Sequence, residues 1–270
     1  MVTDQGQFRI FPRRITGVEA TAARSRRVFP RHTHETFGIG LISGGAQASR
    51  SGRGMVEAGA GDVITVNPGE VHDGSPLGDA GRSWRMLYLD PALVADSLGD
   101  IGEGRALAYE FTQPVLRRPR IAARFTQLFF TLTKGAGGLA VIGWEEQLLA
   151  LLADAMREGD RPPEPAPPAI AAVRSMLDGD PAAPTTLSDM AQQCGLSRFQ
   201  VLRGFERATG LTPHAYLIQR RVSLARRLIA EGLGLAEAAI ASGFADQSHM
   251  TRVFVRRHGI TPGAFAAALA

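Results

Sequence analysis

The sequence predicts two domains: an all-β domain followed by helices, and an all-α domain built from two helix-turn-helix units on a linking helix. Three observations lead to this fold class. About the last hundred residues contain one segment twice, at an offset of 49 residues, and about the first ninety contain short alternating runs broken by glycine. A proline-rich stretch separates the two parts, and 270 residues suffice for two separate cores.

The domain boundaries follow from these patterns. We expect residues 1–158 to form the first domain, with a β-barrel over about 8–115 and helices over about 119–158. Residues 159–168 are rich in proline and predict an extended, semi-rigid linker. Residues 169–270 are expected to form the second domain.

Each copy of the duplicated segment has the pattern of a helix, a tight turn and a second helix. In the first copy, Gly195 is expected to supply the turn between a helix that ends at Cys194 and one that begins near Ser197. In the second copy, the turn is expected at Gly243. The second helix of each copy has one apolar face and one polar, basic face. Two such helices joined by a glycine turn are typical of units that enter the major groove of DNA.

One helix over about 213–231 is predicted between the two copies. It would be roughly 28 Å long, at about 1.5 Å per residue. That length is close to one duplex turn of roughly 34 Å, so we expect the two units to read neighbouring grooves on one DNA face. Four residues of this helix are expected to add positive charge near the phosphates: Arg220, Arg221, Arg226 and Arg227. A plain helical bundle with solvated arginines is the alternative.

The distribution of charge agrees with a DNA-binding second domain. Residues 168–270 contain 11 arginines and 7 acidic residues, whereas residues 1–167 contain 19 basic and 19 acidic residues. The formal net charge of +4 therefore lies on the duplicated domain, as binding to phosphates requires. Since the sequence has no cationic leader and no apolar run near 18 residues, we expect a soluble, cytoplasmic protein with no membrane partner.

The segment Thr186–Ala266 resembles the DNA-binding domain of the AraC/XylS transcriptional regulators. The run Gly243–His249, followed by Gly259–Pro262, is close to the signature of that family. The resemblance implies that two helices point side chains into the groove. The first helix contributes Phe199, Leu202 and Arg203, and the second contributes Ser248, His249, Thr251 and Arg252. Gln247 lies on the same outward face of the second helix.

The chemistry of these residues suggests different contacts. Arg203 and Arg252 are the best candidates for bidentate contacts to guanine, and Leu202 is expected to contact a thymine methyl group. Gly204 lies in the middle of the same helix as Arg203 and is expected to weaken that helix by up to about 1 kcal/mol.

Two histidine clusters carry the chemistry of the first domain. The segment His32–Glu35 precedes a predicted strand, and Asn67–His72 follows one. Both resemble the two short motifs of cupin barrels, which line the pocket of that fold. The leading interpretation is a small-molecule effector site, with Arg85 as an alternative to Trp84 in a set of candidate contacts: His32, His34, Glu35, Glu70, His72 and Trp84.

The three histidines of these clusters are also the candidates for a metal site. In metal cupins, a His-x-His pair is followed about four residues later by a glutamate, and the second motif gives a third histidine. Here Gly38 and Ile39 occupy that position, so the carboxylate is missing. Three histidines can still hold zinc, but we expect no metal and no cofactor. Ordinary pocket lining and turn formation are the simplest alternative.

The helical part of the first domain suggests how two copies of the chain associate. Five residues form one apolar face of the predicted second helix: Trp144, Leu148, Leu151, Leu152 and Ala155. We expect this face to form a dimer contact, as such helices do in the family resembled. Packing on the β domain is the alternative.

Together these features predict a one-component transcription regulator, not an enzyme, whose DNA-binding domain is controlled by an effector in the β domain. The expected partners are double-stranded DNA, a small effector, a second copy of the chain and RNA polymerase. The competing function is a metal-dependent cupin enzyme with an accessory helical domain. A DNA architectural protein would leave the attached β domain unexplained.

Overall fold

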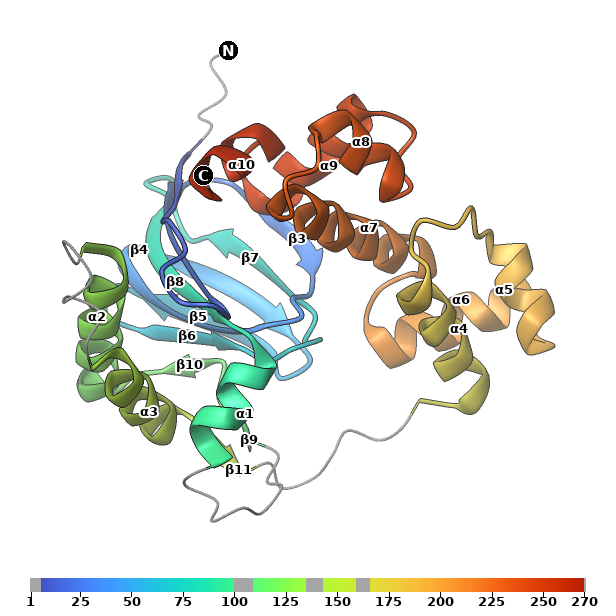
Figure 1. Ribbon diagram of the computed structural model, residues 1–270. Coiled ribbons are helices and arrows are strands. Elements are labelled where there is room, and N and C mark those ends of the chain that lie inside the picture. The colour runs from blue at the N-terminus through green and yellow to red at the C-terminus, as the bar shows by residue number, and fades with distance from the viewer. Residues whose placement is uncertain (1–5, 100–108, 135–142, 159–165, 270) are drawn as a thin grey trace. The chain divides into compact units, whose positions relative to one another are not determined.

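The computed structural model of the chain describes four ranges of residues: 6–99, 109–134, 143–158 and 166–269. The chain divides into two compact units, Met1–Pro162 and Pro163–Ala270. Figure 1 shows the first as a folded β-sheet with flanking helices and the second as a group of helices. Most of the expected linker, residues 159–165, and part of the expected strand region, residues 100–108, lie outside the described residues.

The first unit is built around one antiparallel sheet. Its strands are β1 (Gln7–Ile10), β2 (Val18–Ser25), β3 (Phe29–His32), β4 (Phe37–Ser51), β5 (Gly54–Gly59), β6 (Val63–Val66), β7 (His72–Pro76), β8 (Arg82–Leu89) and β10 (Val115–Leu116). The main path runs β1-β2-β8-β4-β6-β10; β3 pairs with β7, and both β5 and β7 pair with β4. A separate short pair joins β9 (Tyr109–Glu110) to β11 (Arg157–Glu158).

The sheet does not close into a barrel within the described residues, because its path begins at β1 and ends at β10. The expectation of an all-β domain followed by helices is confirmed, and within the described residues the predicted barrel is an open sheet that folds over itself. The helix α1 (Pro91–Gly99) also falls inside the range in which the sequence predicted strands. Barrel closure depends on pairing between distant strands, which the local alternation of residues does not specify.

The two faces of the sheet have different roles. On β8, Leu87 and Leu89 face outward and pack with Phe125 and Leu128 of α2 (Pro119–Lys134), forming the main core of this unit. Figure 1 shows α2 beside α3 (Trp144–Ala155) on that side. Because side chains alternate along a strand, four residues of β8 face the opposite, inner side: Arg82, Trp84, Met86 and Tyr88.

The apolar face of α3 is buried inside its own unit. Leu148, Leu151 and Leu152 belong to the main core, and α3 contacts α2 and α1. The expectation that this face forms a dimer contact is therefore wrong, and packing within the domain is observed. A helical stripe shows which residues seek burial, but its sequence does not say what will cover them.

Two glycines of β4 allow the inner face to pack closely. Gly38 and Gly40 are the register partners of Tyr88 and Met86. A Cβ atom at Gly40 would overlap the sulfur of Met86 and would lie 2.5 Å from the carbonyl oxygen of Arg85. The lack of a side chain at Gly40 is thus a requirement of the packing between β4 and β8.

The second unit is entirely helical in its described residues, as expected. Its helices are α4 (Pro168–Gly179), α5 (Leu187–Cys194), α6 (Arg198–Thr209), α7 (Pro213–Ala230), α8 (Leu235–Ala241), α9 (Gln247–His258) and α10 (Pro262–Leu269). The pairs α5–α6 and α8–α9 are the two helix-turn-helix units, and α7 links them (Figure 1). The 18 residues of α7 give a length of about 27 Å.

Polar contacts fasten α4, the helix that precedes the first helix-turn-helix unit, to α7. The Tyr216 hydroxyl donates a hydrogen bond to Oδ1 of Asp178, at the end of α4, over 2.7 Å. Nε of Arg220 lies 3.0 Å from the same oxygen. Burial, followed by the contact with Asp178, raises the pKa of Tyr216 to about 12, so this hydroxyl remains a donor at neutral pH.

Three of the four arginines of α7 have intramolecular contacts. Besides the ion pair of Arg220 with Asp178, Arg221 donates hydrogen bonds to the carbonyl oxygens of Pro181 and Ala183, at 2.8 and 3.0 Å. The guanidinium of Arg226 lies 4.8 Å from the centre of the Phe265 ring. Arg227 is exposed.

A buried polar contact fastens the second helix-turn-helix unit to α7. Nη1 of Arg257, on α9, donates to Oε1 of Gln219 over 2.9 Å, and Nη2 donates to the carbonyl oxygen of Ala215 over 3.3 Å. Gln219 is only 7% exposed. Burial, followed by the charge of Arg256, lowers the pKa of Arg257 to about 10. The guanidinium therefore stays charged at neutral pH, and both of these bonds are charge-assisted.

Gly204 has a structural reason that the sequence does not show. A Cβ atom at this position would lie 2.8 Å from Cδ1 of the buried Ile170 on α4. Glycine lowers the stability of α6 as an isolated helix, but its lack of a side chain lets α4 pack closely against α6. Local propensity reveals only the cost, because the packing partner is more than thirty residues away.

The variant Gly40→Ala is expected to lower the free energy of unfolding of the first unit by about 1–3 kcal/mol, because the carbonyl of Arg85 cannot rotate away from the new methyl group. The matched control is Gly44→Ala on the same strand, where the nearest atom would be 3.9 Å away. Denaturant unfolding followed by tryptophan fluorescence measures this unit, since it contains both tryptophans of the chain. Equal midpoints for the two variants would contradict the packing described.

The variant Arg257→Met keeps the aliphatic stem but removes both hydrogen bonds to α7. We expect it to destabilise the second unit by about 1–3 kcal/mol, since the buried Gln219 loses a charged donor. Arg256→Met, at the exposed neighbouring position, is the control and should change little. Urea unfolding followed by far-ultraviolet circular dichroism tests this, and a wild-type midpoint for Arg257→Met would show that the contact does not stabilise α9.

Candidate nucleic-acid interface and effector site

Local sequence signals set the two helix-turn-helix turns. Gly195 and Gly243 have φ angles of 63° and 82°, which glycine adopts without a steric penalty. Thr186 caps α5 in a capping box: its hydroxyl accepts from the backbone of Asp189, whose carboxylate accepts from the Thr186 amide at 2.8 Å. The hydrogen bonds from Thr186 lower the pKa of Asp189, so this cap is charged at neutral pH.

The two recognition helices, α6 and α9, begin with equivalent caps. Ser197 and Gln200 form a capping box at the start of α6. Asp246 accepts a hydrogen bond from the amide of His249 over 2.6 Å at the start of α9. These caps satisfy amides that the first turn of a helix leaves without helical partners, and they fix where each recognition helix starts.

The structure places the eight predicted DNA contacts on α6 and α9. Five of them are exposed: Phe199, Arg203, Gln247, Ser248 and Arg252. Leu202, His249 and Thr251 are half-buried, and the ring of His249 stands edge-on to Phe244 at 5.2 Å. Phe199 is 69% exposed, although large apolar side chains usually avoid water. It is therefore available for an apolar contact outside the fold.

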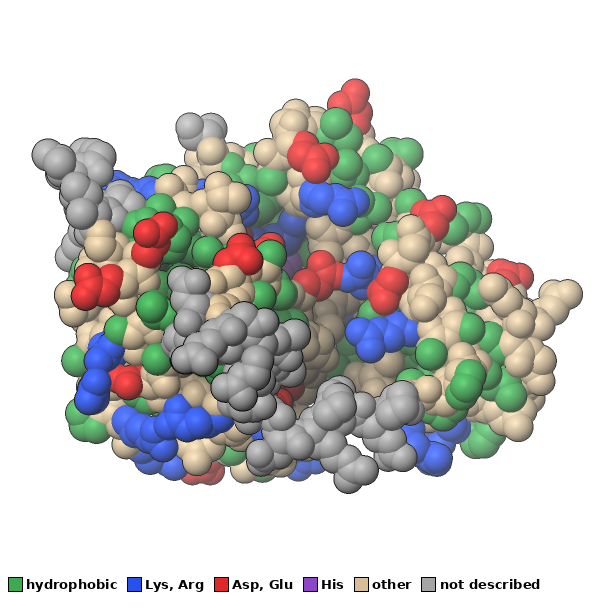
Figure 2. Space-filling model, turned by 60° about the horizontal axis from the view of Figure 1, so that its bottom comes forward, with side chains coloured by type: hydrophobic (Ala, Val, Ile, Leu, Met, Phe, Trp, Pro, Cys, Tyr) green, Lys and Arg blue, Asp and Glu red, His purple; other side chains and the backbone are tan. Residues whose placement is uncertain are grey.

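Basic residues project from both recognition helices. Arg203 and Arg207 on α6 and Arg252 and Arg256 on α9 are exposed. The face shown in Figure 2 also carries acidic side chains among the basic ones on the second unit. Positive and negative side chains are thus mixed on this face of the second unit. The arginines of the recognition helices are of the type that contacts phosphates or guanine edges.

In the first unit, aromatic and histidine side chains gather on the inner face of the sheet. The β3–β7 ribbon approaches this face, with Phe29 at 6.0 Å from the ring of Trp84 and His34 at 5.1 Å from that of Tyr88. Phe8 of β1 also lies edge-on to Trp84, at 6.0 Å. These contacts create a surface with an apolar, aromatic part beside an imidazole part.

The three predicted histidines come together. His32 and His72 are direct register partners on β3 and β7, and their ring centres are 4.3 Å apart. One ring nitrogen from each of His32, His34 and His72 lies within 4.8 Å of the others, the sole group of its kind among the described residues. Burial lowers the pKa of His72, so that imidazole is neutral at physiological pH.

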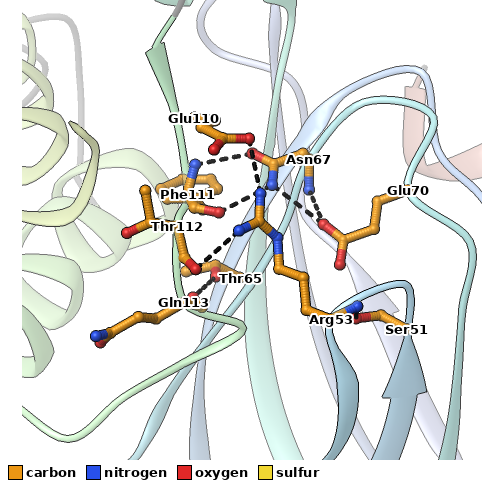
Figure 3. A network of polar contacts seen from close by, with 9 residues as sticks. All are labelled: Ser51, Arg53, Thr65, Asn67, Glu70, Glu110, Phe111, Thr112 and Gln113. Carbon is orange, nitrogen blue, oxygen red and sulfur yellow. Dashed lines mark hydrogen bonds and ion pairs between the residues drawn. The ribbon is translucent and has the colours of Figure 1, made fainter. Parts of the chain in front are cut away.

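The two predicted glutamates do not join the histidines. Oε2 of Glu70 accepts hydrogen bonds from the backbone amide and Nδ2 of Asn67, at 3.2 and 3.1 Å (Figure 3). Asn67 also exchanges hydrogen bonds with the backbone of Phe111, so Glu70 belongs to a network that fastens this turn to the segment before β10. Glu35 is exposed.

The rest of that network fixes the same segment. Arg53 donates to the carboxylate of Glu110 over 2.7 Å and to the carbonyl oxygen of Thr112 over 2.9 Å, and Thr65 donates to the carbonyl oxygen of Gln113 over 2.6 Å (Figure 3). The turn over Asn67–His72, which the sequence motif suggested for a ligand, thus also contains Asn67 and Glu70, whose side chains have a structural role.

Arg82 is a residue of the inner face that the sequence interpretation missed. It is only 3% exposed, and it donates to the carbonyl oxygens of Arg27 and Gly74, at 3.3 and 3.2 Å. Its guanidinium lies 4.9 Å from the ring centre of Trp84, and burial lowers its pKa to about 10. Arg82 therefore holds the β3–β7 ribbon against β8. No sequence motif marks it, because its partners are backbone carbonyls.

Arg85 and the cavity near β1 and β2 lie apart from the predicted effector residues. Arg85, the alternative to Trp84, faces the helices, with its guanidinium 5.3 Å from the ring centre of Phe130. A cavity of about 240 Å³ contains none of the predicted effector residues; it is lined by Gln7, Arg24, Ser25, Arg26 and Ala80. The predicted effector residues that gather on the inner face are the three histidines and Trp84.

Comparison with known proteins agrees with this organisation. Residues 15–152 match the AraC-like ligand binding domain, and residues 190–268 match a helix-turn-helix domain. The chain is 29% identical over 228 residues to the uncharacterized HTH-type transcriptional regulator YbfI of Bacillus subtilis, covering 82% of this chain and 81% of that protein. It is 33% identical over 234 residues to a protein of Streptomyces lividans described as an AraC-like transcription regulator, covering 82% and 69%.

Solved structures show the same two-domain fold. The apo form of a single-residue variant of ToxT from Vibrio cholerae matches with a TM-score of 0.60 and 13% identity, covering 95% of this chain and 99% of that one. Wild-type ToxT bound to an unsaturated fatty acid matches with a TM-score of 0.57 and 14% identity, covering 94% and 95%. None of the described helices is long and apolar enough to cross a membrane. With a ligand-binding domain joined to a DNA-binding helix-turn-helix domain, the chain belongs to the AraC-like family of transcription regulators.

Proposed function

We propose that this regulator reads two neighbouring major-groove segments with α6 and α9 and is controlled by a small effector on the inner face of the β domain. The observation that carries the proposal is the duplicated helix-turn-helix, whose two recognition helices are fastened to one linking helix. The length of α7, about 27 Å, suits two helices that enter grooves roughly 34 Å apart.

Arg203 and Arg252 are proposed to make the main base contacts. Each is the sixth residue of its recognition helix, each is exposed, and arginine binds guanine through two hydrogen bonds. Phe199 and Leu202 are proposed to make apolar contacts from α6. The proposed polar contacts from α9 come from Gln247, Ser248, His249 and Thr251. The two helices would thus read their grooves with different chemistry.

The effector is proposed to contact His32, His34, His72 and Trp84. These side chains gather on one face, whereas Glu35 is exposed and Glu70 is bound by Asn67. The aromatic surroundings of Trp84 favour a ligand with an apolar part. The bound fatty acid of ToxT supports this class of ligand for a domain of the same fold. Control of DNA binding requires the effector to bind two arrangements of the protein with different affinity.

A binding role is proposed for the β domain rather than a catalytic one, because the relatives are transcription regulators and the carboxylate of Glu70 has a structural partner. RNA polymerase and a second copy of the chain are the other proposed partners. A homodimer would use a surface other than the buried face of α3. The proposed reading of two groove segments does not require a dimer, because one chain already carries two recognition helices. Since the relatives are bacterial, we propose that the protein acts on DNA in the cytoplasm.

The variant Arg252→Ala is expected to weaken binding to the preferred DNA by about 1–3 kcal/mol and to relax the preference at one base pair. Arg227→Ala, on the exposed side of α7, should weaken binding to all sequences alike. Fluorescence anisotropy with the native upstream DNA and with base-pair variants, over a series of salt concentrations, measures both effects. Equal, sequence-independent losses would show that Arg252 contacts only phosphate.

Binding of an apolar ligand on the inner face should change the fluorescence of Trp84. In the variant Trp144→Phe, where Trp84 is the remaining tryptophan, titration with an unsaturated fatty acid is expected to give a saturable change. The matched variant Trp84→Phe, which retains Trp144 on α3, should give none. A change of the same size in both variants would place the ligand elsewhere or indicate nonspecific binding.

A further inference from the structure

The histidine cluster links two separate segments of the first unit. His32 ends β3, His34 follows it by two residues, and His72 begins β7. Their ligand nitrogens lie within 4.8 Å of one another. In a tetrahedral zinc site with Zn–N distances of about 2.1 Å, neighbouring nitrogens are about 3.4 Å apart. Small side-chain rotations, of about 1 Å at the nitrogen, would therefore complete such a site.

Two of the imidazoles are already oriented as metal ligands are. Nδ1 of His32 lies 2.8 Å from the carbonyl oxygen of Pro30, and Nδ1 of His72 lies 3.2 Å from that of Glu70. A carbonyl oxygen only accepts hydrogen bonds, so Nδ1 is the donor in both rings, and Nε2 is the nitrogen left to bind a metal ion. Metal-binding histidines show this arrangement, in which a carbonyl fixes the tautomer and the direction of the ring.

We propose that His32, His34 and His72 bind one divalent transition metal ion of the zinc class and leave at least one coordination position open. Imidazole ligands favour zinc, copper, nickel and cobalt over magnesium and calcium, which prefer oxygen ligands. The site differs from the metal-cupin pattern, because Gly38 stands near the expected carboxylate position and Glu70 is bound by Asn67. This proposal replaces the sequence-based expectation of no metal.

The position of the site suggests its consequence. The ion would join both strands of the β3–β7 ribbon, and the ribbon contacts the inner face through Phe29 and His34. Metal binding would therefore restrain the segment that covers the proposed effector surface. An open coordination position would accept an oxygen or nitrogen atom of a ligand, as three-ligand zinc sites do.

Cobalt titration of the full-length protein tests the site directly, because protein-bound Co²⁺ absorbs visible light. The wild type is expected to bind one ion per chain with a visible absorption band that zinc abolishes. His72→Ala should bind about 100-fold more weakly, since even loss of an outer-shell partner costs about 10–100-fold. The matched control is His214→Ala, at an exposed position of the second unit, which should bind as the wild type does.

Substoichiometric cobalt binding by the wild type would overturn the proposal, as would equal weakening by His72→Ala and His214→Ala. If His72→Ala fails to fold, as tryptophan fluorescence would show, His34→Gln on the loop after β3 provides the same comparison with less change in volume. These titrations contain no DNA. Their failure would leave the proposed DNA binding intact, and failure of DNA binding would leave the metal site intact.

Hydrogen exchange locates the ion independently. Zinc is expected to slow exchange in peptides that cover β3 and β7 in the wild type, and to leave the same peptides unchanged in His72→Ala. The helices of the second unit are the internal reference and should not respond. Zinc-dependent protection confined to segments without His32, His34 or His72 would place the ion at another site and overturn the proposal.

Discussion

The fastening of two helix-turn-helix units to one helix is the constraint on which the DNA-binding unit depends. At the first helix-turn-helix unit, Tyr216 of α7 packs edge-on against Phe205 of α6 and donates to Asp178 of α4, and Arg221 binds the loop after α4. At the second unit, Arg257 binds the buried Gln219. These contacts use charged groups of α7 and α9 inside the protein, where they fix geometry rather than meet DNA. Because both recognition helices are held by the same helix, the distance between them is set by its length.

In the β domain, side chains alternate along each strand, so one face of the sheet packs on helices and the other is left for the proposed ligand. Outward side chains of β2, β4 and β8 pack on α2, and this leaves the inner face for aromatic, histidine and arginine side chains. Gly40 permits the close approach of β4 and β8 behind that face, and Arg82 holds the β3–β7 ribbon in front of it. A ligand or metal ion bound at the proposed sites would act on this ribbon.

Features carried by local residues could be predicted from the sequence, and features made by distant partners could not. The helices of the second unit follow from caps and from glycines such as Gly195 and Gly243, whose signals lie within a few residues. The histidine cluster was also visible as two short motifs. The open form of the sheet, the burial of the α3 face and the reason for Gly204 depend on elements far along the chain. Glu70, from the second histidine motif, and Arg85 were candidates for the effector site, but their contacts with Asn67 and Phe130 give them other roles.

The most direct test of the central claim is a high-resolution footprint of the full-length protein on its native upstream DNA. Two recognition helices on one linking helix predict two protected major-groove segments on the same face of the duplex. Their centres should lie about one turn apart, roughly 10 base pairs. A single protected segment, or two segments on opposite faces, would contradict the account that α7 sets the spacing of two readers.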